Sequence, residues 1–391
     1  MTEQALKLGD CAKVISGYAF KSKDFVDEGV PVLKIANIKH EHVVFDGVQY
    51  LPTEFLNIDG KFKVKFGDVM ICLTGSHISQ PNSVVGRVAM YRHDRLALLN
   101  QRAGRIVVND TERLDKDFLY YFLRQEKIMH DLALNAGGAA NQANISPKDV
   151  ERIELPEIDI SSQRAISSTL KSYDDLIENN KRRIELLEES ARQLYKEWFV
   201  RFRFPGHEHV KIIDGVPEGW EAKKVGELLR KVKRPGKVKK DDYSEFGDFP
   251  CIDQSQDFIG GFTDDPEVIV KEPLPLVVFG DHTRVLKFIG FQFACGADGT
   301  QLLHPNDDRL SIEYFYFSLV AIDLSNYFYA RHFKFLKDQI VLIPSRQLMR
   351  SFTDFASSNM KQISKLRDQS RQLANARDLL LTKLMNGEIA V

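Results

Sequence analysis

Residues 164–198 read RAISSTLKSYDDLIENNKRRIELLEESARQLYKEW, and this stretch decides the architecture of the chain. Its seam residues recur at spacings of four and three without a break, which is an a/d heptad pattern. Such a pattern predicts one long helix that packs along a second helix. The polar Asn180 is the kind of residue that fixes the register of a helix pair at some cost in stability. The seam comprises Ile166, Leu170, Tyr173, Ile177, Asn180, Ile184, Leu187, Ala191, Leu194 and Trp198.

A second seam lies at a constant offset of 186 residues, from Arg350 to Leu384. It contains fewer apolar residues, so its far end is also a candidate contact for another protein. Two seams in one chain, separated by a globule, pair most simply with each other. Antiparallel pairing would place the two globules at opposite ends of a rod about 55 Å long, at about 1.5 Å per residue. The second seam comprises Phe352, Ala356, Asn359, Ile363, Leu366, Ser370, Leu373, Arg377, Leu380 and Leu384.

The segments before the two helices are repeated as well, in the same order. A long internal period decides the architecture before any residue chemistry does. Two copies of about 190 residues form a duplicated domain rather than a stacked solenoid. The matching pairs are Leu8-Gly9-Asp10 with Val225-Gly226-Glu227, 114–123 with 310–319, and 152–156 with 340–344.

We therefore predict an α+β fold with two tandem mixed α/β domains and two long helices that form an antiparallel coiled coil. The predicted segments are the first domain at 1–160, a central helical spacer at 161–203, the second domain at 204–345 and a C-terminal helical spacer at 346–391. Helices are expected at 117–129 and 312–327, and closing strands at 148–155 and 339–343. Other β-like runs, bounded by Gly, Asn and Asp, are 30–35, 68–74, 86–91, 103–108, 249–252, 276–279, 284–289 and 300–303.

The composition is that of an ordinary soluble protein, with 43% hydrophobic and 28% charged residues among 391. The net charge of −1 gives no global sign of nucleic-acid binding, although local patches bind phosphates whatever the total. Four scattered cysteines without a CxxC pair favour a reduced, cytoplasmic setting. The N-terminus lacks a signal-peptide apolar core, and no apolar run approaches the roughly 20 residues of a membrane span. No membrane partner is expected.

The common catalytic motifs are absent from the sequence. It has no GxxxxGK followed by Ser or Thr, no HExxH and no GxSxG. It also lacks the Asn-Pro-Pro-aromatic tetrapeptide that an amino-methyltransferase needs to hold its target base. His207-Glu-His209 could be read as a metal pair, but an exposed polar loop is favoured. Gly137-Gly138 is no dinucleotide fingerprint, because no strand-to-helix turn carries it. The sequence predicts neither a catalytic residue nor a metal site.

What remains is recognition chemistry. The tract 230–240 places seven cations in eleven positions, which favours phosphate contact over a solvated loop. Its candidate contacts are Lys237, Lys239 and Lys240. Lys181-Arg182-Arg183 lies on the outer side of the first seam, where a solvated face is an equally good interpretation.

Polar loops follow corresponding strands in the two halves, and further polar segments precede the two closing strands. Side chains such as Gln80, Asn82 and Arg284 suit bidentate contacts to base edges. Each loop alone is more simply an ordinary turn. Because such loops recur in both halves, however, contact with DNA becomes an equally good interpretation. The candidate DNA contacts are Ser76, His77, Gln80, Asn82, Asn141, Gln142, Asn144, Asp281, His282, Thr283, Arg284, Arg331, His332 and Lys334.

These residues resemble a known family. The phrase from Ser162 to Asn180, continued to Glu197-Trp-Phe199, looks like the central helical region of the specificity (S) subunit of type I restriction–modification enzymes. The ending from Arg377 to Ile389 looks like the distal helical region of that family. Asn144-Ile-Ser is similar to the end of a target-recognition domain. The resemblance covers essentially the whole chain, and its specificity lies in the layout rather than in any single motif.

The resemblance implies two target-recognition domains that each read one half of a split sequence in double-stranded DNA, with the helices as a ruler. It implies two modification subunits that bind S-adenosylmethionine and methylate adenine, and motor-nuclease restriction subunits that use ATP with Mg. No cofactor is expected in this chain, and target adenines would be flipped into the partner's pocket. The segment 280–284 matches the first-half loop only loosely, so the two half-sites are expected to differ.

The rival hypothesis is a non-catalytic protein-interaction scaffold with two binding globules on a coiled-coil strut. The near-neutral charge favours it slightly, whereas the amide-rich loops and the Lys/Arg tract disfavour it. A nuclease or methyltransferase in its own right is disfavoured by the missing motifs.

Overall fold

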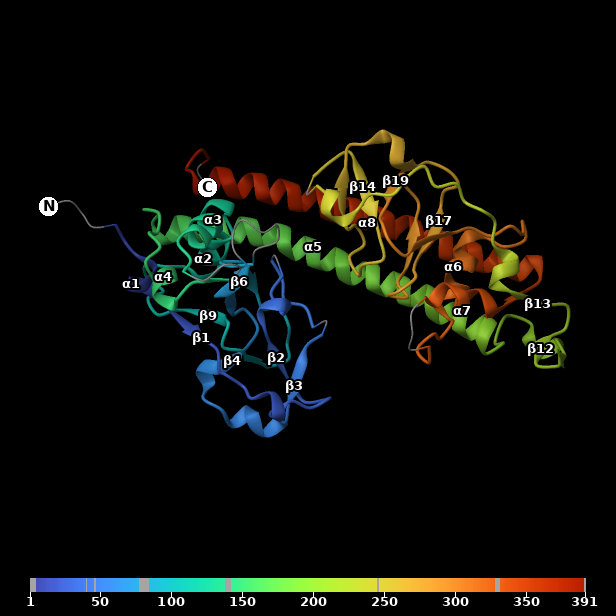
Figure 1. Ribbon diagram of the computed structural model, residues 1–391, viewed down its shortest axis with the longest axis horizontal. Coiled ribbons are helices and arrows are strands. Elements are labelled where there is room, and N and C mark those ends of the chain that lie inside the picture. The colour runs from blue at the N-terminus through green and yellow to red at the C-terminus, as the bar shows by residue number, and fades with distance from the viewer. Residues whose placement is uncertain are drawn as a thin grey trace. The chain divides into compact units, whose positions relative to one another are not determined.

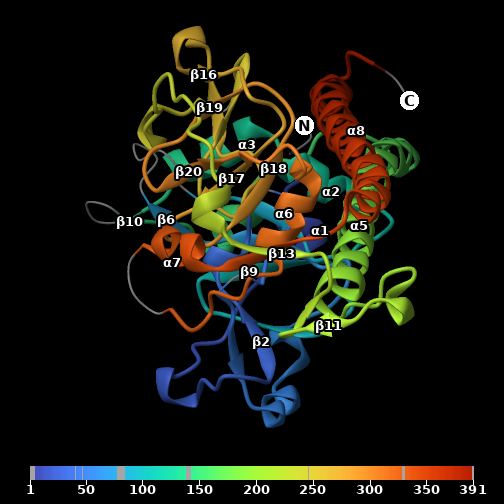
Figure 2. The same cartoon turned by 90° about the vertical axis from the view of Figure 1, so that its right-hand side faces the viewer.

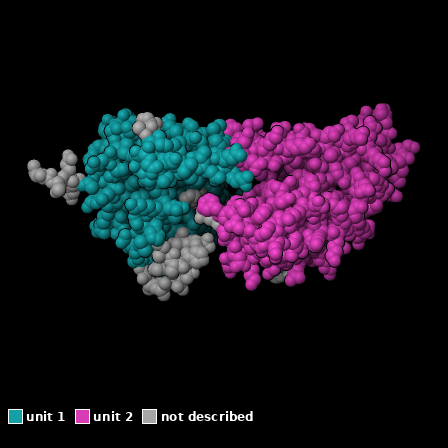
Figure 3. Space-filling view, turned by 90° about the horizontal axis from the view of Figure 1, so that it is seen from above, with its two compact units in different colours: residues 1–177, 371–391 teal, residues 178–370 magenta. Residues whose placement is uncertain are grey.

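The fold is given by a computed structural model that describes residues 5–39, 41–45, 47–76, 84–137, 142–244, 246–327 and 331–389. The chain divides into two compact units (Figure 3). Unit 1 comprises residues 1–177 and 371–391, and unit 2 comprises residues 178–370. Because the long helices α5 (Ile160–Tyr195) and α8 (Arg346–Met385) extend through both ranges, each unit contains one β-rich globule and part of both helices.

Unit 1 is built on two four-stranded sheets and a two-stranded ladder (Figure 1). One sheet has the order β1-β9-β5-β7, the second has the order β3-β2-β8-β4, and the ladder joins β10 to β6. Only β2 and β8 pair in parallel among the strands described in this unit. The elements are α1 (Leu8–Cys11), β1 (Ala12–Ser16), β2 (Val30–Leu33), β3 (Gln49–Leu51), β4 (Lys63–Val64), β5 (Val69–Cys72), β6 (Thr74–Ser76), β7 (Val88–Met90), β8 (Ala97–Leu99), β9 (Ala103–Val108), α2 (Lys116–Leu123), α3 (Glu126–Leu134), β10 (Gln142–Asn144) and α4 (Pro147–Glu151).

Unit 2 contains the sheets β15-β14-β19-β16 and β18-β17-β20, and the pairs β13-β21 and β11-β12. The helix α6 contributes buried residues to the core of this unit, and α7 immediately precedes the last strand. The elements are β11 (Ile212–Ile213), β12 (Val216–Pro217), β13 (Glu221–Lys224), β14 (Phe249–Ile252), β15 (Gly261–Thr263), β16 (Ile269–Val270), β17 (Leu276–Gly280), β18 (Leu286–Ile289), β19 (Phe293–Cys295), β20 (Thr300–Leu303), α6 (Ile312–Val320), α7 (His332–Asp338) and β21 (Ile340–Ile343).

The two units share the topology of one four-stranded sheet and of a three-stranded core of another. β2 pairs in parallel with β8 and antiparallel with β3, while β14 pairs in parallel with β19 and antiparallel with β15. The strands β4 and β16 complete these two sheets in the same way, antiparallel to β8 and β19. Likewise, β5 lies between β7 and β9 as β17 lies between β18 and β20. The internal repeat in the sequence therefore reflects a duplicated fold.

The long helices pair antiparallel within each unit (Figure 2). In unit 2, Asn359 Nδ2 donates to the Leu187 carbonyl at 3.0 Å and to Ser190 Oγ at 2.9 Å, while Arg367 reaches Glu188 at 2.8 Å. At the end of α5 and just beyond it, the ring centroids of Tyr195 and Phe199 lie 5.8 and 5.3 Å from that of Phe352, so the residue number falls along α8 as it rises along α5. All twenty residues of the two predicted seams are buried or half-buried, which confirms the heptad prediction.

The helix pair is part of the core of each unit. In unit 1, Ile166 and Leu170 of α5 share a buried cluster with Leu381 and Leu384 of α8 and with the aromatic face of α2. In unit 2, the ring of Phe352 is fully buried, and it lies 5.3 Å from Phe199 and 6.0 Å from Tyr314 in edge-to-face contacts. Such aromatic pairs stabilise by about 0.5–1.5 kcal/mol beyond the buried area.

The predicted closing strand at 148–155 is wrong. Residues 147–151 form the helix α4, because Ser146 and Asp149 make a reciprocal capping box and Pro147 occupies the first helical turn. Only a single bridge, from Glu154 to Lys7, replaces the β13–β21 pairing of unit 2. The predicted helix at 117–129 is broken between α2 and α3, and the one at 312–327 ends at Val320.

Candidate nucleic-acid interface

In unit 1, a short ladder brings two of the predicted polar segments together. Ser76 of β6 pairs with Gln142 of β10, and Thr74 pairs with Asn144. Gln142 and Asn144 are exposed while Ala143 is buried, because successive side chains of a strand point to opposite faces. Their side-chain amides are 3.5 Å apart, so they form one exposed amide surface. The other candidates of this half, His77, Gln80, Asn82 and Asn141, lie outside the described residues.

In unit 2, the segment after β17 contacts the start of α7. The Asp281 carbonyl accepts from the His332 backbone N–H at 2.9 Å, and its carboxylate accepts from the Phe333 N–H at 2.7 Å. These are N–H groups that a helix start leaves without an intrahelical acceptor. Since β17 takes the place of β5, equivalent segments meet in both units: the segment after this strand contacts the one before the last element of the globule.

Two of the predicted contacts in this half are structural rather than exposed. Asp281 is 5% exposed and His332 is 7% exposed, so neither presents its side chain as the sequence predicts. Asp281 is buried because it supplies acceptors to the start of α7. Nδ1 of His332 has no hydrogen-bond partner among the described residues.

The remaining candidates of this half are exposed: His282, Thr283, Arg284, Arg331 and Lys334. The Arg284 guanidinium donates to the Leu324 carbonyl at 3.0 Å, which directs it along the end of α6.

Gln254, which the sequence did not single out, shapes this exposed segment. Its Oε1 accepts from the His282 backbone N–H at 3.0 Å, and its Nε2 donates to the Asp298 carbonyl at 2.9 Å. Its own carbonyl accepts from Thr283 Oγ1 at 2.6 Å. Only these long-range contacts distinguish Gln254 from any other polar residue after a strand, so no local signal could have found it.

The basic tract borders a groove of about 650 Å³ in unit 2. Residues 229–234 and 301–303 line this groove together with Phe333 of α7, so the tract and the start of α7 share one surface. Arg234 donates to Gln301 Oε1 at 2.9 Å, and Arg230 lies 3.2 Å from His304 Nε2. Burial and the nearby Arg230 lower the pKa of His304, although a contact with the Pro305 carbonyl opposes them. A neutral imidazole at this position can accept a hydrogen bond from Arg230.

The three candidate lysines of the tract are exposed. Lys237 Nζ lies 3.6 Å from the Asp298 carboxylate, a surface pair of small energetic value. Lys239 and Lys240 lie at the start of a short 3-10 turn, Lys240–Asp242. The positive charge of this tract is therefore directed largely at solvent and is available to an anionic partner.

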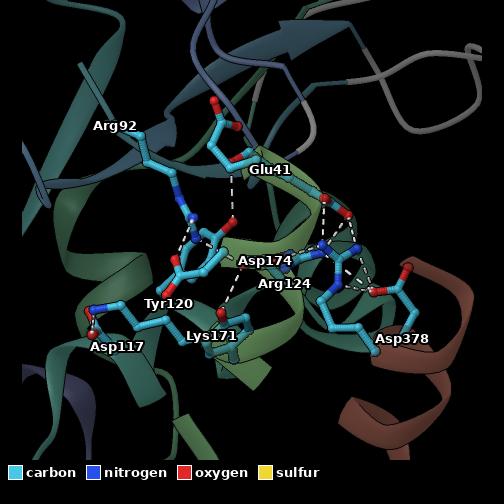
Figure 4. Close-up of polar contacts among 12 residues, drawn as sticks. Glu41, Arg92, Asp117, Tyr120, Arg124, Lys171, Asp174 and Asp378 are labelled. Atoms are coloured by element: carbon cyan, nitrogen blue, oxygen red, sulfur yellow. Dashed lines mark hydrogen bonds and ion pairs between the residues drawn. The ribbon is translucent and has the colours of Figure 1, made fainter. Parts of the chain in front are cut away.

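A cluster of buried charges in unit 1 was missed from the sequence (Figure 4). The Arg377 guanidinium, with its side chain 2% exposed, donates to Asp174 Oδ1 at 2.5 Å and to the Glu41 carboxylate at 2.5 and 2.9 Å. The second oxygen of Asp174 accepts from Arg92 at 2.9 Å and from the Tyr121 hydroxyl at 2.8 Å.

Arg124 completes this cluster. It reaches Glu41 at 2.5 Å and Asp378 at 3.5 Å, and its guanidinium lies over the rings of Tyr120 and Tyr121. The cluster thus joins α5, α8, α2 and the loop after β2.

The electrostatics of the cluster favour the charged forms of its central pair. Burial acts to raise the pKa of Asp174, but the guanidiniums of Arg377 and Arg124 and the Tyr121 hydroxyl together lower it. Burial likewise opposes the charge of Arg377, yet the carboxylates of Glu41 and Asp174 raise its pKa. Asp174 and Arg377 are therefore an ion pair rather than a pair of neutral groups, while Nε and Nη1 of Arg124 have no hydrogen-bond partner among the described residues.

Other site chemistry is limited in the described part of the chain. Among those residues, no group of three or more His, Cys, Asp or Glu side chains is arranged to hold a metal ion. His207-Glu-His209 forms a short 3-10 turn without buried residues. The four cysteines are buried as free thiols. Of the helices in the described ranges, none has both the length and the apolar character needed to span a membrane.

The sequence is similar to those of known proteins. Residues 3–189 match the family described as the type I restriction modification DNA specificity domain. The chain is 28% identical over 195 residues to the type I restriction enzyme MjaVIII specificity subunit of Methanocaldococcus jannaschii, covering 49% of this chain and 44% of that protein. It is 24% identical over 358 residues to the MjaIX specificity subunit of the same organism, covering 84% and 81%.

A solved structure has the same fold. The crystal structure of the type I restriction–modification S subunit from M. genitalium aligns over 97% of this chain and 95% of that chain, with a TM-score of 0.54 and 19% identity. At that identity the likeness concerns the fold alone, which has two β-rich domains with long helices packed together. Over residues 3–189 the chain therefore matches the type I restriction modification DNA specificity domain, and over most of its length it is similar to type I specificity subunits.

Proposed function

We propose that this chain reads a split DNA sequence, with one half-site read by each unit, and presents it to the modification subunits of a type I restriction–modification enzyme. The observation that carries this proposal is the duplicated topology. In both units the same strand leads into a polar segment, and that segment contacts the one before the last element of the globule. Two equivalent reading surfaces in one chain suit a target of two half-sites.

The chemistry of these surfaces fits base reading in a groove. In unit 1, the exposed amides of Gln142 and Asn144 can pair with the N6 and N7 atoms of adenine in a bidentate manner. In unit 2, Arg284 and Arg331 offer the fork of donors that suits guanine O6 and N7. The two surfaces differ in chemistry, so the two half-sites are expected to differ in sequence.

Phosphate contacts would set the register of the protein on the duplex. The exposed Lys237, Lys239 and Lys240 follow residues 229–234, which line a groove together with Phe333 of α7. Contacts of this kind position a protein but carry no sequence information, whereas contacts to base edges specify the sequence. The tract and the α7 segment would then divide these two tasks within unit 2.

The spacing between the half-sites would be set by the helix pair. Antiparallel helices with interlocked seams are stiff, and a stiff spacer fixes both separation and phase along DNA, as half-site spacing does for symmetric dimers. The polar residues Asn180 and Asn359 of the two seams are buried at 7% and 6% exposure, which suits a role in fixing their register.

Catalysis would come from partner subunits. Two modification subunits would bind S-adenosylmethionine and take the flipped target adenine into their own pocket. Motor-nuclease restriction subunits with ATP and Mg would join this core. The chain itself would hold no cofactor.

The test is methylation of a random DNA library by the chain assembled with its modification subunits. We expect methylated adenines to define two short motifs separated by a constant number of base pairs. A single contiguous motif would contradict the proposal of two readers. Assembly with modification subunits but methylation without sequence preference would favour the scaffold hypothesis instead.

A further inference from the structure

The ionic residues on the helices of unit 1 are replaced by apolar residues at the matching positions of unit 2, whose own buried ion pair, Lys287 with Asp253, lies on β18 and the loop after β14. At the helix offset of 186 residues, Arg377 corresponds to Ala191 and Asp174 corresponds to Met360. At the offset of 196 residues that relates α2 to α6, Tyr121 corresponds to Phe317. Ala191, Met360 and Phe317 are all members of the buried apolar cluster of unit 2. The same place in the fold is thus apolar in one unit and ionic in the other.

This comparison shows that the fold does not need charges at that place. Replacement of a buried ion pair by apolar residues of similar volume is often neutral or stabilising. Arg377 moreover occupies a seam position of α8, where apolar residues pack best. A role other than general stability is therefore needed to account for the ionic cluster.

The contacts of the cluster lead from the helices to the reading surface of unit 1. Glu41 bridges to Ala89 in β7, and Arg92 follows β7 by two residues, so Arg377 and Asp174 fix this strand at two points. β7 pairs with β5 from Val69 to Ile71. β5 continues through Leu73 into β6, which carries Ser76 opposite Gln142.

We propose that Arg377 is a positioning residue for recognition of the DNA half-site read by unit 1, acting through Asp174 and Glu41 on β7. Its planar guanidinium bonds two carboxylates from different elements at once, which sets an orientation as well as a distance. This inference rests on the proposed function, because it assumes that unit 1 reads one half-site.

Unit 2 offers a matched control in Arg367, another arginine of α8. Its guanidinium lies 3.8 Å from the ring centroid of Phe258 and pairs with Glu188 of α5 at 2.8 Å. Phe258 belongs to the loop after β14, as Glu41 belongs to the loop after β2, and these two strands are equivalent. Each globule is therefore joined to an arginine of α8 through the same loop, by a carboxylate in unit 1 and by an aromatic ring in unit 2.

The experiment uses the full chain assembled with its modification subunits and the random-library methylation readout, with Arg377→Met, Arg377→Lys and Arg367→Met compared with the unaltered chain. For Arg377→Met we expect discrimination against single mismatches to fall about tenfold or more at the half-site of unit 1, and to stay within about twofold at the other. Arg367→Met should show the mirror pattern. Arg377→Lys keeps the positive charge but loses the planar set of donors that bonds two carboxylates at once. Discrimination in this variant should therefore lie between that of Arg377→Met and that of the unaltered chain.

A purely structural role is separated by two further measurements. Thermal unfolding of each assembled variant reports on folding, and Glu41→Gln is a milder change that keeps the Arg377–Asp174 pair and should relax the same half-site more weakly. The inference is overturned if Arg377→Met, or Glu41→Gln should the former not fold, relaxes both half-sites equally or neither. If the unaltered complex yields no two-part motif, the proposed function itself fails, and this outcome differs from a two-part motif that the variants leave unchanged.

Discussion

Removal of Asp174 should destabilise unit 1 and leave unit 2 almost unaffected. In Asp174→Ala, the Arg377 and Arg92 guanidiniums lose their shared carboxylate in a place where Arg377 is 1% exposed, so water cannot replace it. Breaking a buried ion pair by removing one partner costs about 3–5 kcal/mol. Because Glu41 and Asp378 remain within 2.9 Å of Arg377, we expect the lower end, about 3 kcal/mol.

A double-mutant cycle separates the ion pair from the cavity that truncation leaves. In Asp174→Ala with Arg377→Ala, no arginine at position 377 is left without its carboxylate, so the double variant should lose less than the sum of the two single variants. The expected coupling is about 1–3 kcal/mol, as is usual for residues in one buried network. Asp174→Met with Arg377→Ala copies the apolar pair of unit 2 and should be the least destabilised of the double variants.

The assay must follow the two units separately, since a chain of two units need not unfold in one step. Both tryptophans of the chain, Trp198 and Trp220, lie in unit 2, so their fluorescence in urea serves as an internal control. Hydrogen exchange of peptides from 160–177 and 371–385 reports on unit 1. The reasoning would be refuted if the single variants cost less than about 1 kcal/mol, or if tryptophan fluorescence shifted as much as hydrogen exchange in unit 1.

Three further predictions concern pH, salt and the start of α7. The folded-state pKa of Asp174 lies below its ordinary value of 3.8, so its contribution to stability is present above that value and is lost as the pH falls through the folded pKa; Asp174→Asn should remove this part of the acid dependence, measured by urea unfolding between about pH 2 and 6. Replacement of Lys237, Lys239 and Lys240 by Gln should weaken binding to all DNA sequences alike and flatten the slope of log K against log salt by up to about 0.9 for each lost phosphate contact, and an unchanged slope would mean that the tract is merely solvated. Asp281→Ala should cost about 1–2 kcal/mol through the lost acceptor at the start of α7, measured by urea unfolding of unit 2, and an unchanged midpoint would show that this contact contributes nothing.

The helices and their pairing could be predicted because the signal is local and sustained. Each seam holds its spacing of four and three over several heptads, and the structure buries those positions wholly or in part. The strand runs 103–108, 249–252 and 300–303 also coincide with β9, β14 and β20. Their flanking Gly, Pro and Asp residues mark the ends of these strands in the sequence itself.

The prediction of a closing strand at 148–155 was wrong because the helix-start signal just before it was overlooked. Its alternation of polar and apolar residues looks like a strand, but Ser146 and Asp149 form a capping box around Pro147 and start a helix instead. Here the chemistry of a helix start prevailed over a short β-like pattern.

The candidate site could be predicted only in outline, because its details depend on contacts between distant residues. Asp281 and His332 are polar residues in loop-like sequence, yet each is buried through contacts across some fifty positions of the chain. Glu41, Asp174 and Arg377 lie even further apart in the sequence, and nothing near any of them indicates an ionic partner. A charged residue at a seam position, such as Arg377, is the one local sign that could have prompted a search for buried partners.

The most direct test of two independent readers is an exchange of one domain followed by methylome sequencing. Residues 1–155 would be replaced by the equivalent domain of another type I specificity subunit, with both long helices kept unchanged. We predict that one half-site of the methylated sequence changes, while the other half-site and the spacer length persist. A change in both half-sites together would contradict the account, because the two units would then form one composite reading surface.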